Sequence, residues 1–122
     1  MGTMKTREIP SSEWFDYFGH FSKKHTGSLA TLRILTEGFG AQIEARKLPL
    51  EGIVSTHREG SAIEIAIDLG RGVSTHIEHT VPDPARVWAQ FGDDGEETAI
   101  DIESKDGTRT ILEILPKIPQ GA

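Results

Sequence analysis

The hydrophobic positions of this chain follow a helical period near the N-terminus and a period of two from residue 28 onward. One stretch carries aromatic residues at helical spacing, namely Trp14, Phe15, Phe18 and Phe21. Ser11 and Ser12 precede this stretch as helix N-caps, and Gly27 follows it as a stop signal. The pattern predicts one amphipathic helix, and we expect its aromatic stripe to pack as core against a sheet.

From residue 28, apolar and polar residues alternate in short runs that are separated by turn residues. The clearest run extends from Ile63 to Leu69, where every second residue is a large aliphatic one. Asp106-Gly107 is typical of a two-residue hairpin turn, because both residues tolerate a positive φ. The pattern predicts further strands at 28–35, 41–46, 53–57, 73–81, 100–103 and 112–114. It predicts turns at 38–40, 48–52, 58–60 and 70–72.

Residues 83–91 fit two structures. Asp83-Pro84 at the start and Gly92 after the end are the signals of a short helix. However, Val87, Ala89 and Phe91 also alternate with Arg86, Trp88 and Gln90, and this period of two is typical of a strand. We favour a strand, because the neighbouring elements are all short strands. The choice decides whether Trp88 points away from the core or into it.

Together these patterns predict a mainly β (α+β) fold. It consists of an N-terminal amphipathic helix followed by an antiparallel meander of about eight short strands, which form a strongly bent sheet or a partly open barrel. We expect the helix to pack on one face of the sheet or across an open end. The 122 residues fit a single domain, 1–122, with frayed tails at 1–8 and 116–122.

The amino-acid composition indicates in which compartment the protein works and which classes of partner it does not bind. The absence of cysteine excludes disulfides and thiolate chemistry, and it favours a reducing, cytoplasmic setting. The net charge of −6 argues against a nucleic-acid partner, because phosphate binding depends mainly on positive charge. No apolar stretch is long enough to span a bilayer, so we expect no membrane partner. Residues 92–97 are expected to form a solvated acidic loop.

The run His76-Ile77-Glu78-His79 contains the most suggestive potential ligands. On a strand, His76 and Glu78 share one face. Together with His57 they would line a small-ligand or hydrolytic pocket in a curved sheet. We favour the alternative, scattered histidines, because a metal site needs three or four convergent ligands. We therefore predict no metal and no cofactor, and we expect His20 and His25 on the helix surface.

Trp88 is the main candidate for recognition. In a strand it would point outward beside Arg86 and Gln90, and an exposed Trp beside Arg is typical of binding hot spots. The alternative is that Trp88 packs under the helix or against nearby prolines. No catalytic motif is present. Our leading hypothesis is therefore a non-catalytic binding or accessory module, which binds a protein partner or forms a homodimer through a sheet edge or the Trp88 face.

Five segments of the chain resemble one known family. They are Arg7-Glu8-Ile9-Pro10 with Glu13-Trp14 and Phe18, residues 40–46, residues 48–52, His76-Ile77-Glu78-His79, and Ile102-Glu103 with Asp106-Gly107-Thr108. In these segments the chain is similar to a bacterial family of short proteins classified only as a domain of unknown function. The resemblance covers nearly the whole chain. It implies a soluble bacterial protein, and it implies no activity and no functional residues.

Overall fold

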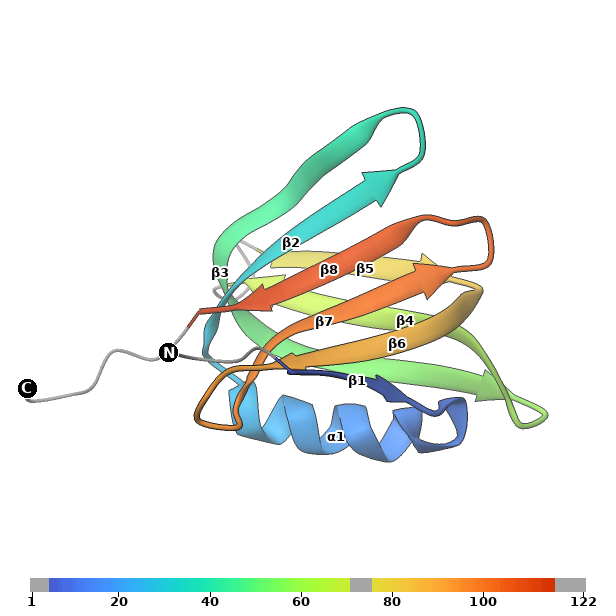
Figure 1. The fold of residues 1–122 in the computed structure, drawn as a ribbon, viewed down its shortest axis with the longest axis horizontal. Coiled ribbons are helices and arrows are strands. Elements are labelled where there is room, and N and C mark those ends of the chain that lie inside the picture. Colours follow the sequence, from blue (N-terminus) through green and yellow to red (C-terminus); the bar gives the residue numbers. More distant parts are fainter. Residues whose placement is uncertain (1–4, 71–75, 116–122) are drawn as a thin grey trace, which may run out of the picture.

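The computed structural model describes residues 5–70 and 76–115. Within them it confirms a mainly β fold with an N-terminal helix (Figure 1). The helical elements are a short 3-10 helix, Ser11–Glu13, and α1, Trp14–His25. The strands are β1 (Lys5–Ile9), β2 (Leu29–Thr36), β3 (Gly40–Arg58), β4 (Ser61–Gly70), β5 (His76–Pro82), β6 (Pro84–Phe91), β7 (Glu97–Ser104) and β8 (Arg109–Ile114). The expected tail at 116–122 and the first residues of the expected strand 73–81 lie outside the described residues.

The strands form one antiparallel sheet in the order β1-β6-β7-β8-β2-β3-β4-β5. The sheet folds over on itself because β3 pairs with β2 through its first half and with β4 through its second half. Layer A therefore contains β1, β6, β7, β8, β2 and the first half of β3. Layer B contains the second half of β3 with β4 and β5 (Figure 1). We call the face of layer A that points away from layer B the outer face.

The predicted turn at 48–52 is wrong, because β3 runs through these residues and joins two strands that were expected to be separate. Lys47 has a positive φ of 52°, and β3 exchanges its partner strand between Pro49 and Leu50. A proline, which has no amide hydrogen, is tolerated where a strand changes partners. The turn-like residues therefore produce a bend within a continuous strand.

The strand order also differs from a single run of sequential hairpins. β8 returns to pair with β2, and β1 pairs with β6. Residues 5–8 were expected to belong to a frayed tail, but together with the buried Ile9 they form the edge strand β1. β1 and β5 end the sheet at opposite edges, so the sheet is bent and open.

Helix α1 closes the open side between the two layers (Figure 1). Its aromatic stripe enters the core as expected at Trp14, Phe18 and Phe21, whereas Phe15 is 62% exposed and was wrongly expected in the core. The Ser22 hydroxyl accepts a hydrogen bond from the Ile53 amide and donates one to the Ile53 carbonyl. One serine thus satisfies two backbone groups on the free edge of β3, where a further strand would otherwise pair.

The segment at 84–91 is a strand, as we favoured. Val87 and Ala89 are fully buried, and Trp88 lies half-buried on the opposite, outer face. The chain passes from layer B to layer A at Asp83, whose φ is 47°. The Asp83 amide donates to the Ile63 carbonyl, and the Asp83 carbonyl accepts from the Lys105 amide. These bonds fix the corner that leads into β6.

Candidate functional site

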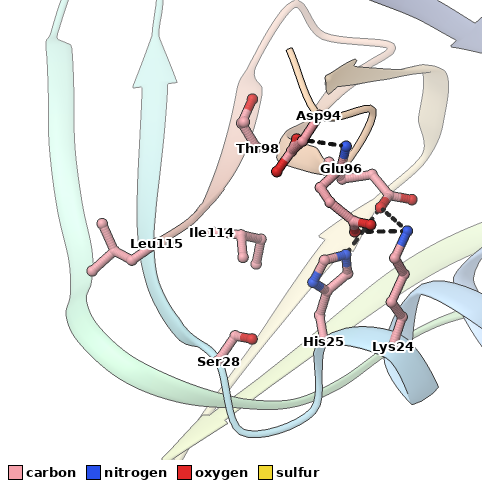
Figure 2. A pocket seen from close by; sticks show the side chains of 9 residues that line it. Lys24, His25, Ser28, Asp94, Glu96, Thr98, Ile114 and Leu115 are labelled. Carbon is pink, nitrogen blue, oxygen red and sulfur yellow. Dashed lines mark hydrogen bonds and ion pairs between the residues drawn. The ribbon is translucent and has the colours of Figure 1, made fainter. Parts of the chain in front are cut away.

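A pocket of about 350 Å³ lies where the C-terminal end of α1 meets the β6–β7 turn and the end of β8 (Figure 2). Residues from segments that are distant in the sequence line it. They are Lys24 and His25 of α1, the nearby Ser28, then Asp94, Glu96, Glu97 and Thr98, and finally Ile114 and Leu115. The pocket thus combines ionisable groups on one side with two aliphatic side chains on the other (Figure 2).

Glu97 is the centre of a hydrogen-bond network beside this pocket. Its Oε1 lies 3.0 Å from His25 Nε2 and 3.3 Å from Lys24 Nζ. Its Oε2 accepts a hydrogen bond of 2.9 Å from the Tyr17 hydroxyl. Burial acts to raise the pKa of Glu97, but these hydrogen bonds and one from its own amide outweigh burial and lower the pKa to about 2. Glu97 is therefore ionised at neutral pH, with both oxygens occupied.

Two of the groups that bond to Glu97, Tyr17 and Lys24, each keep one protonation state. Burial, followed by the charge of Glu97, raises the pKa of Tyr17 above its ordinary value. A hydrogen bond to Glu96, with 2.8 Å between Nζ and Oε2, is the main cause that raises the pKa of Lys24. Tyr17 therefore remains a neutral donor and Lys24 remains a cation throughout the physiological pH range.

Two polar side-chain atoms of buried residues face the pocket, and neither is hydrogen-bonded within the part of the chain that the structure describes. One is His25 Nδ1, on a residue that is 7% exposed, and the other is the hydroxyl of Ser28, which is 4% exposed (Figure 2). Both are open to the pocket, because among the described residues the polar side-chain atom that is both buried and unpartnered is Asp68 Oδ1. An ionised carboxylate only accepts hydrogen bonds, so His25 must donate through Nε2 to Glu97. Nδ1, the other ring nitrogen, is directed into the pocket (Figure 2).

His25, Glu96 and Glu97 also have the composition of a metal site, since one ligand atom from each lies within 4.8 Å of the others. The Lys24 ammonium group, however, contacts both carboxylates. It supplies the positive charge that a metal ion would bring, and a metal would have to displace it. In this structure the cluster is an ion-pair network.

Two expectations about these residues are wrong. His25 was expected on the helix surface, but it is buried with its ring centroid 4.5 Å from that of Phe21. Glu97 was expected in a solvated loop, but it begins β7 and its side chain is only 9% exposed. Tyr17 was not singled out. The available signal was spacing, because His25 follows Phe21 by four residues and Tyr17 precedes Phe21 by four.

The structure does not bring His57, His76 and Glu78 together. His57 pairs with Ala62 and His76 with Gly70, which lie at opposite ends of β4. At 3.3 Å per residue, this separation is on the order of 25 Å. His57 Nε2 lies 2.9 Å from the Ser55 hydroxyl, and His76 Nδ1 lies 3.3 Å from a Glu51 oxygen. Glu78 shares the face of His76, as the alternation predicted, and it is exposed.

Trp88, Arg86 and Gln90 share the outer face of layer A, as a strand requires. Trp88 lies opposite Asp101 on β7, and its ring centroid is 6.0 Å from the Arg109 guanidinium carbon. Arg109 donates two hydrogen bonds to Asp101, which is 3% exposed. These hydrogen bonds are the main cause that raises the pKa of Arg109. Trp88 therefore packs within a carboxylate–guanidinium cluster rather than beneath α1.

The fold and the site define a mainly β protein with a ligand-sized pocket at the end of its N-terminal helix. The chain belongs to the family described as "Family of unknown function (DUF5335)", whose model matches residues 5–119. This confirms the resemblance drawn from the sequence. An uncharacterized protein of Aquifex aeolicus (strain VF5) is 32% identical over 116 residues, which cover 95% of this chain and 97% of that protein. No solved structure matches the chain.

Among the described residues, no helix combines the length and the apolar character that crossing a membrane requires.

Proposed function

We propose that this protein is a non-catalytic binding module that holds a small ligand in the pocket at the C-terminal end of α1. The observation that carries this proposal is the pocket itself, into which two polar atoms of buried residues, His25 Nδ1 and the Ser28 hydroxyl, are directed without a partner among the described residues. A concave pocket with an aliphatic wall and a few convergent polar groups is typical of ligand sites.

The protonation states beside the pocket favour binding over catalysis. A general acid or base works best when its pKa lies near the working pH. The pKa of Glu97 is lowered to about 2, and that of Tyr17 is raised. At neutral pH both groups keep their protonation state, and both are fully engaged with each other or with α1. They are suited to holding His25 in one orientation.

We also propose a bacterial, cytoplasmic location. The absence of cysteine supports a reducing compartment, and the similar protein of Aquifex aeolicus supports a bacterial source.

A thermal-shift screen of small molecules from several chemical classes tests the binding function. We expect one class to raise the melting temperature of the wild-type protein, because a ligand that binds only the folded state stabilises it. Ser28→Ala should weaken that effect, whereas Ser61→Ala, at an exposed position of β4, should retain it. If no class stabilises the protein, or if Ser28→Ala responds like the wild type, the pocket is not the binding site.

A second candidate function is docking of a protein partner or a second copy on the outer face of layer A. No other described element covers this face, which carries Trp88 with Arg86 and Gln90 and extends to Ile43, 43% exposed. The unpaired edge of β1 is a second route to a homodimer. Trp88→Ala should keep the fold and shift the sedimentation coefficient at high protein concentration. If Trp88→Ala unfolds the protein, the recognition role is wrong.

A further inference from the structure

We infer that the ligand of the pocket is a small organic cation, namely an aliphatic amine or guanidine. The inference rests on the proposed binding function and adds the chemical class of the ligand. It follows from the charge balance of the lining residues, from the hydrogen-bonding capacity of the buried groups, and from the placement of the aliphatic residues.

The charge balance of the pocket is negative. Three carboxylates line it, those of Asp94, Glu96 and Glu97, against one ammonium group, that of Lys24. Lys24 is already bonded to Glu96 and Glu97, so it offers little to an incoming anion. One Asp94 oxygen accepts a hydrogen bond of 2.9 Å from the Glu96 amide, and its second oxygen has no partner among the described residues. The pocket therefore attracts a cation and repels a carboxylate or phosphate.

The hydrogen-bonding capacity of the buried groups favours the same class. His25 directs Nδ1 into the pocket, because its other ring nitrogen bonds to Glu97 (Figure 2). The Ser28 hydroxyl accepts or donates, and its backbone is fixed, since its amide donates to the His25 carbonyl and its carbonyl accepts from the Leu50 amide. The second oxygen of Asp94 only accepts hydrogen bonds, and the Ser28 hydroxyl can accept one, so a ligand that satisfies both must bring donors. Ammonium and guanidinium groups are donors only, whereas a carboxylate brings only acceptors.

The aliphatic residues of the pocket favour a ligand whose cationic group carries a short apolar chain. Ile114 and Leu115 lie across the pocket from the ionisable side chains (Figure 2). A short aliphatic chain attached to the cationic group would bury its methylene groups against them. Lys24 shows the same chemistry within the chain, because its ammonium group sits against the carboxylates of Glu96 and Glu97.

Calorimetric titration and thermal shift with matched four-carbon probes test the class of ligand. The probes are n-butylammonium, n-butylguanidinium, n-butanol and butyrate, with Zn²⁺ as a separate metal probe. We expect the two cations to bind and to raise the melting temperature, and butyrate to do neither. Asp94→Asn should weaken n-butylammonium binding about tenfold, which is the size expected for one charge-assisted hydrogen bond. Asp93→Asn removes the same charge from a neighbouring residue outside the pocket, and it should weaken binding less than about twofold.

The contrary results show whether the cationic class of the ligand, the binding function, or both are wrong. Butyrate or n-butanol binding that is lost in Ser28→Ala would overturn the cationic class and leave the binding function standing. Stabilisation by Zn²⁺ with no response to n-butylammonium would overturn the class in favour of a metal held by His25, Glu96 and Glu97. Binding of n-butylammonium that is unchanged in Asp94→Asn would place it outside the pocket and overturn the inference. A flat response to every probe and to the wider screen would overturn both proposals.

Discussion

Strand β7 carries two buried carboxylates that are held in different ways. Glu97 is bonded by Tyr17, Lys24 and His25, three side chains of α1 that lie 72 to 80 residues away in the sequence. Asp101 is bonded by one residue, Arg109, which lies eight residues away on the neighbouring strand. The first carboxylate connects the helix to the sheet, and the second connects two strands of one hairpin.

The difference shows how similar residue types form either an ion pair that satisfies itself or part of a pocket. Arg109 bonds both oxygens of Asp101, and its guanidinium carbon lies 6.0 Å from the centroid of the Trp88 ring. The three donors to Glu97 all belong to α1. His25 keeps its second ring nitrogen directed into the pocket (Figure 2). Only the Glu97 cluster therefore leaves hydrogen-bonding groups for a ligand.

Loss of the Glu97 carboxylate should have the largest effect. Glu97→Ala should lower the free energy of unfolding by about 3 kcal/mol, because it leaves the buried His25 and the half-buried Tyr17 without their acceptor. Urea denaturation measures this loss. The matched control is Glu96→Ala, since the Glu96 side chain is 50% exposed and its ion pair should contribute less than about 1 kcal/mol. Equal losses in the two variants would contradict the role of Glu97 as the link between helix and sheet.

The acid stability of the protein should depend on Glu97. Its pKa is about 2 in the folded state against 4.5 for the unfolded chain, so the unfolded state binds the proton first as the pH falls. The stabilisation by Glu97 is therefore full above about pH 4.5 and is lost towards pH 2, with a total on the order of 2 kcal/mol. Urea denaturation between these values should show a shallower pH dependence for Glu97→Gln. Parallel curves for both proteins would contradict the lowered pKa.

Breaking the Asp101 cluster should have a smaller effect, confined to stability. Arg109→Ala should cost about 1–2 kcal/mol, because it leaves the Asp101 carboxylate buried without its cation, while the exposed Arg109 side chain itself contributes little. Arg86→Ala, on the same outer face, should change the free energy of unfolding by less than about 0.5 kcal/mol. Calorimetry should find the affinity of the pocket for n-butylammonium unchanged in both variants. A loss of affinity in Arg109→Ala would show that the two clusters are coupled.

The smallest stability effect is expected for Ser28→Ala. The hydroxyl has no partner among the described residues, so its removal should change the free energy of unfolding by less than about 0.5 kcal/mol. The same variant should lose ligand-induced stabilisation. A large loss of stability without ligand would assign Ser28 to the structure rather than to binding.

The alternation of residues predicted much of the fold, and it failed where tertiary contacts decide the structure. It predicted the strand at 84–91 and the outward direction of Trp88. It failed at 48–52, where turn-forming residues bend a long strand that exchanges partners. It missed β1 because Lys5–Ile9 has little apolar character, and this strand forms only because β6 offers a free edge.

The pocket was beyond prediction from the sequence, because its parts meet only through the fold. His25 and Glu97 each have an ordinary setting in the sequence, at a helix end and in an acidic run. Their contact requires α1 to cross the open side of the bent sheet, and alternation of residues carries no information on that placement. The histidines of β3 and β5 looked more suggestive, yet the strand register separates them.

Nitrogen NMR of the His25 ring at about pH 8 tests the central claim most directly, with the exposed His20 as an internal reference. We expect a proton on Nε2, where Glu97 accepts it, and we expect added n-butylammonium to shift the Nδ1 resonance, because Nδ1 faces the pocket. A ring without a proton on Nε2, or a His25 spectrum that does not respond to saturating n-butylammonium, would contradict the account.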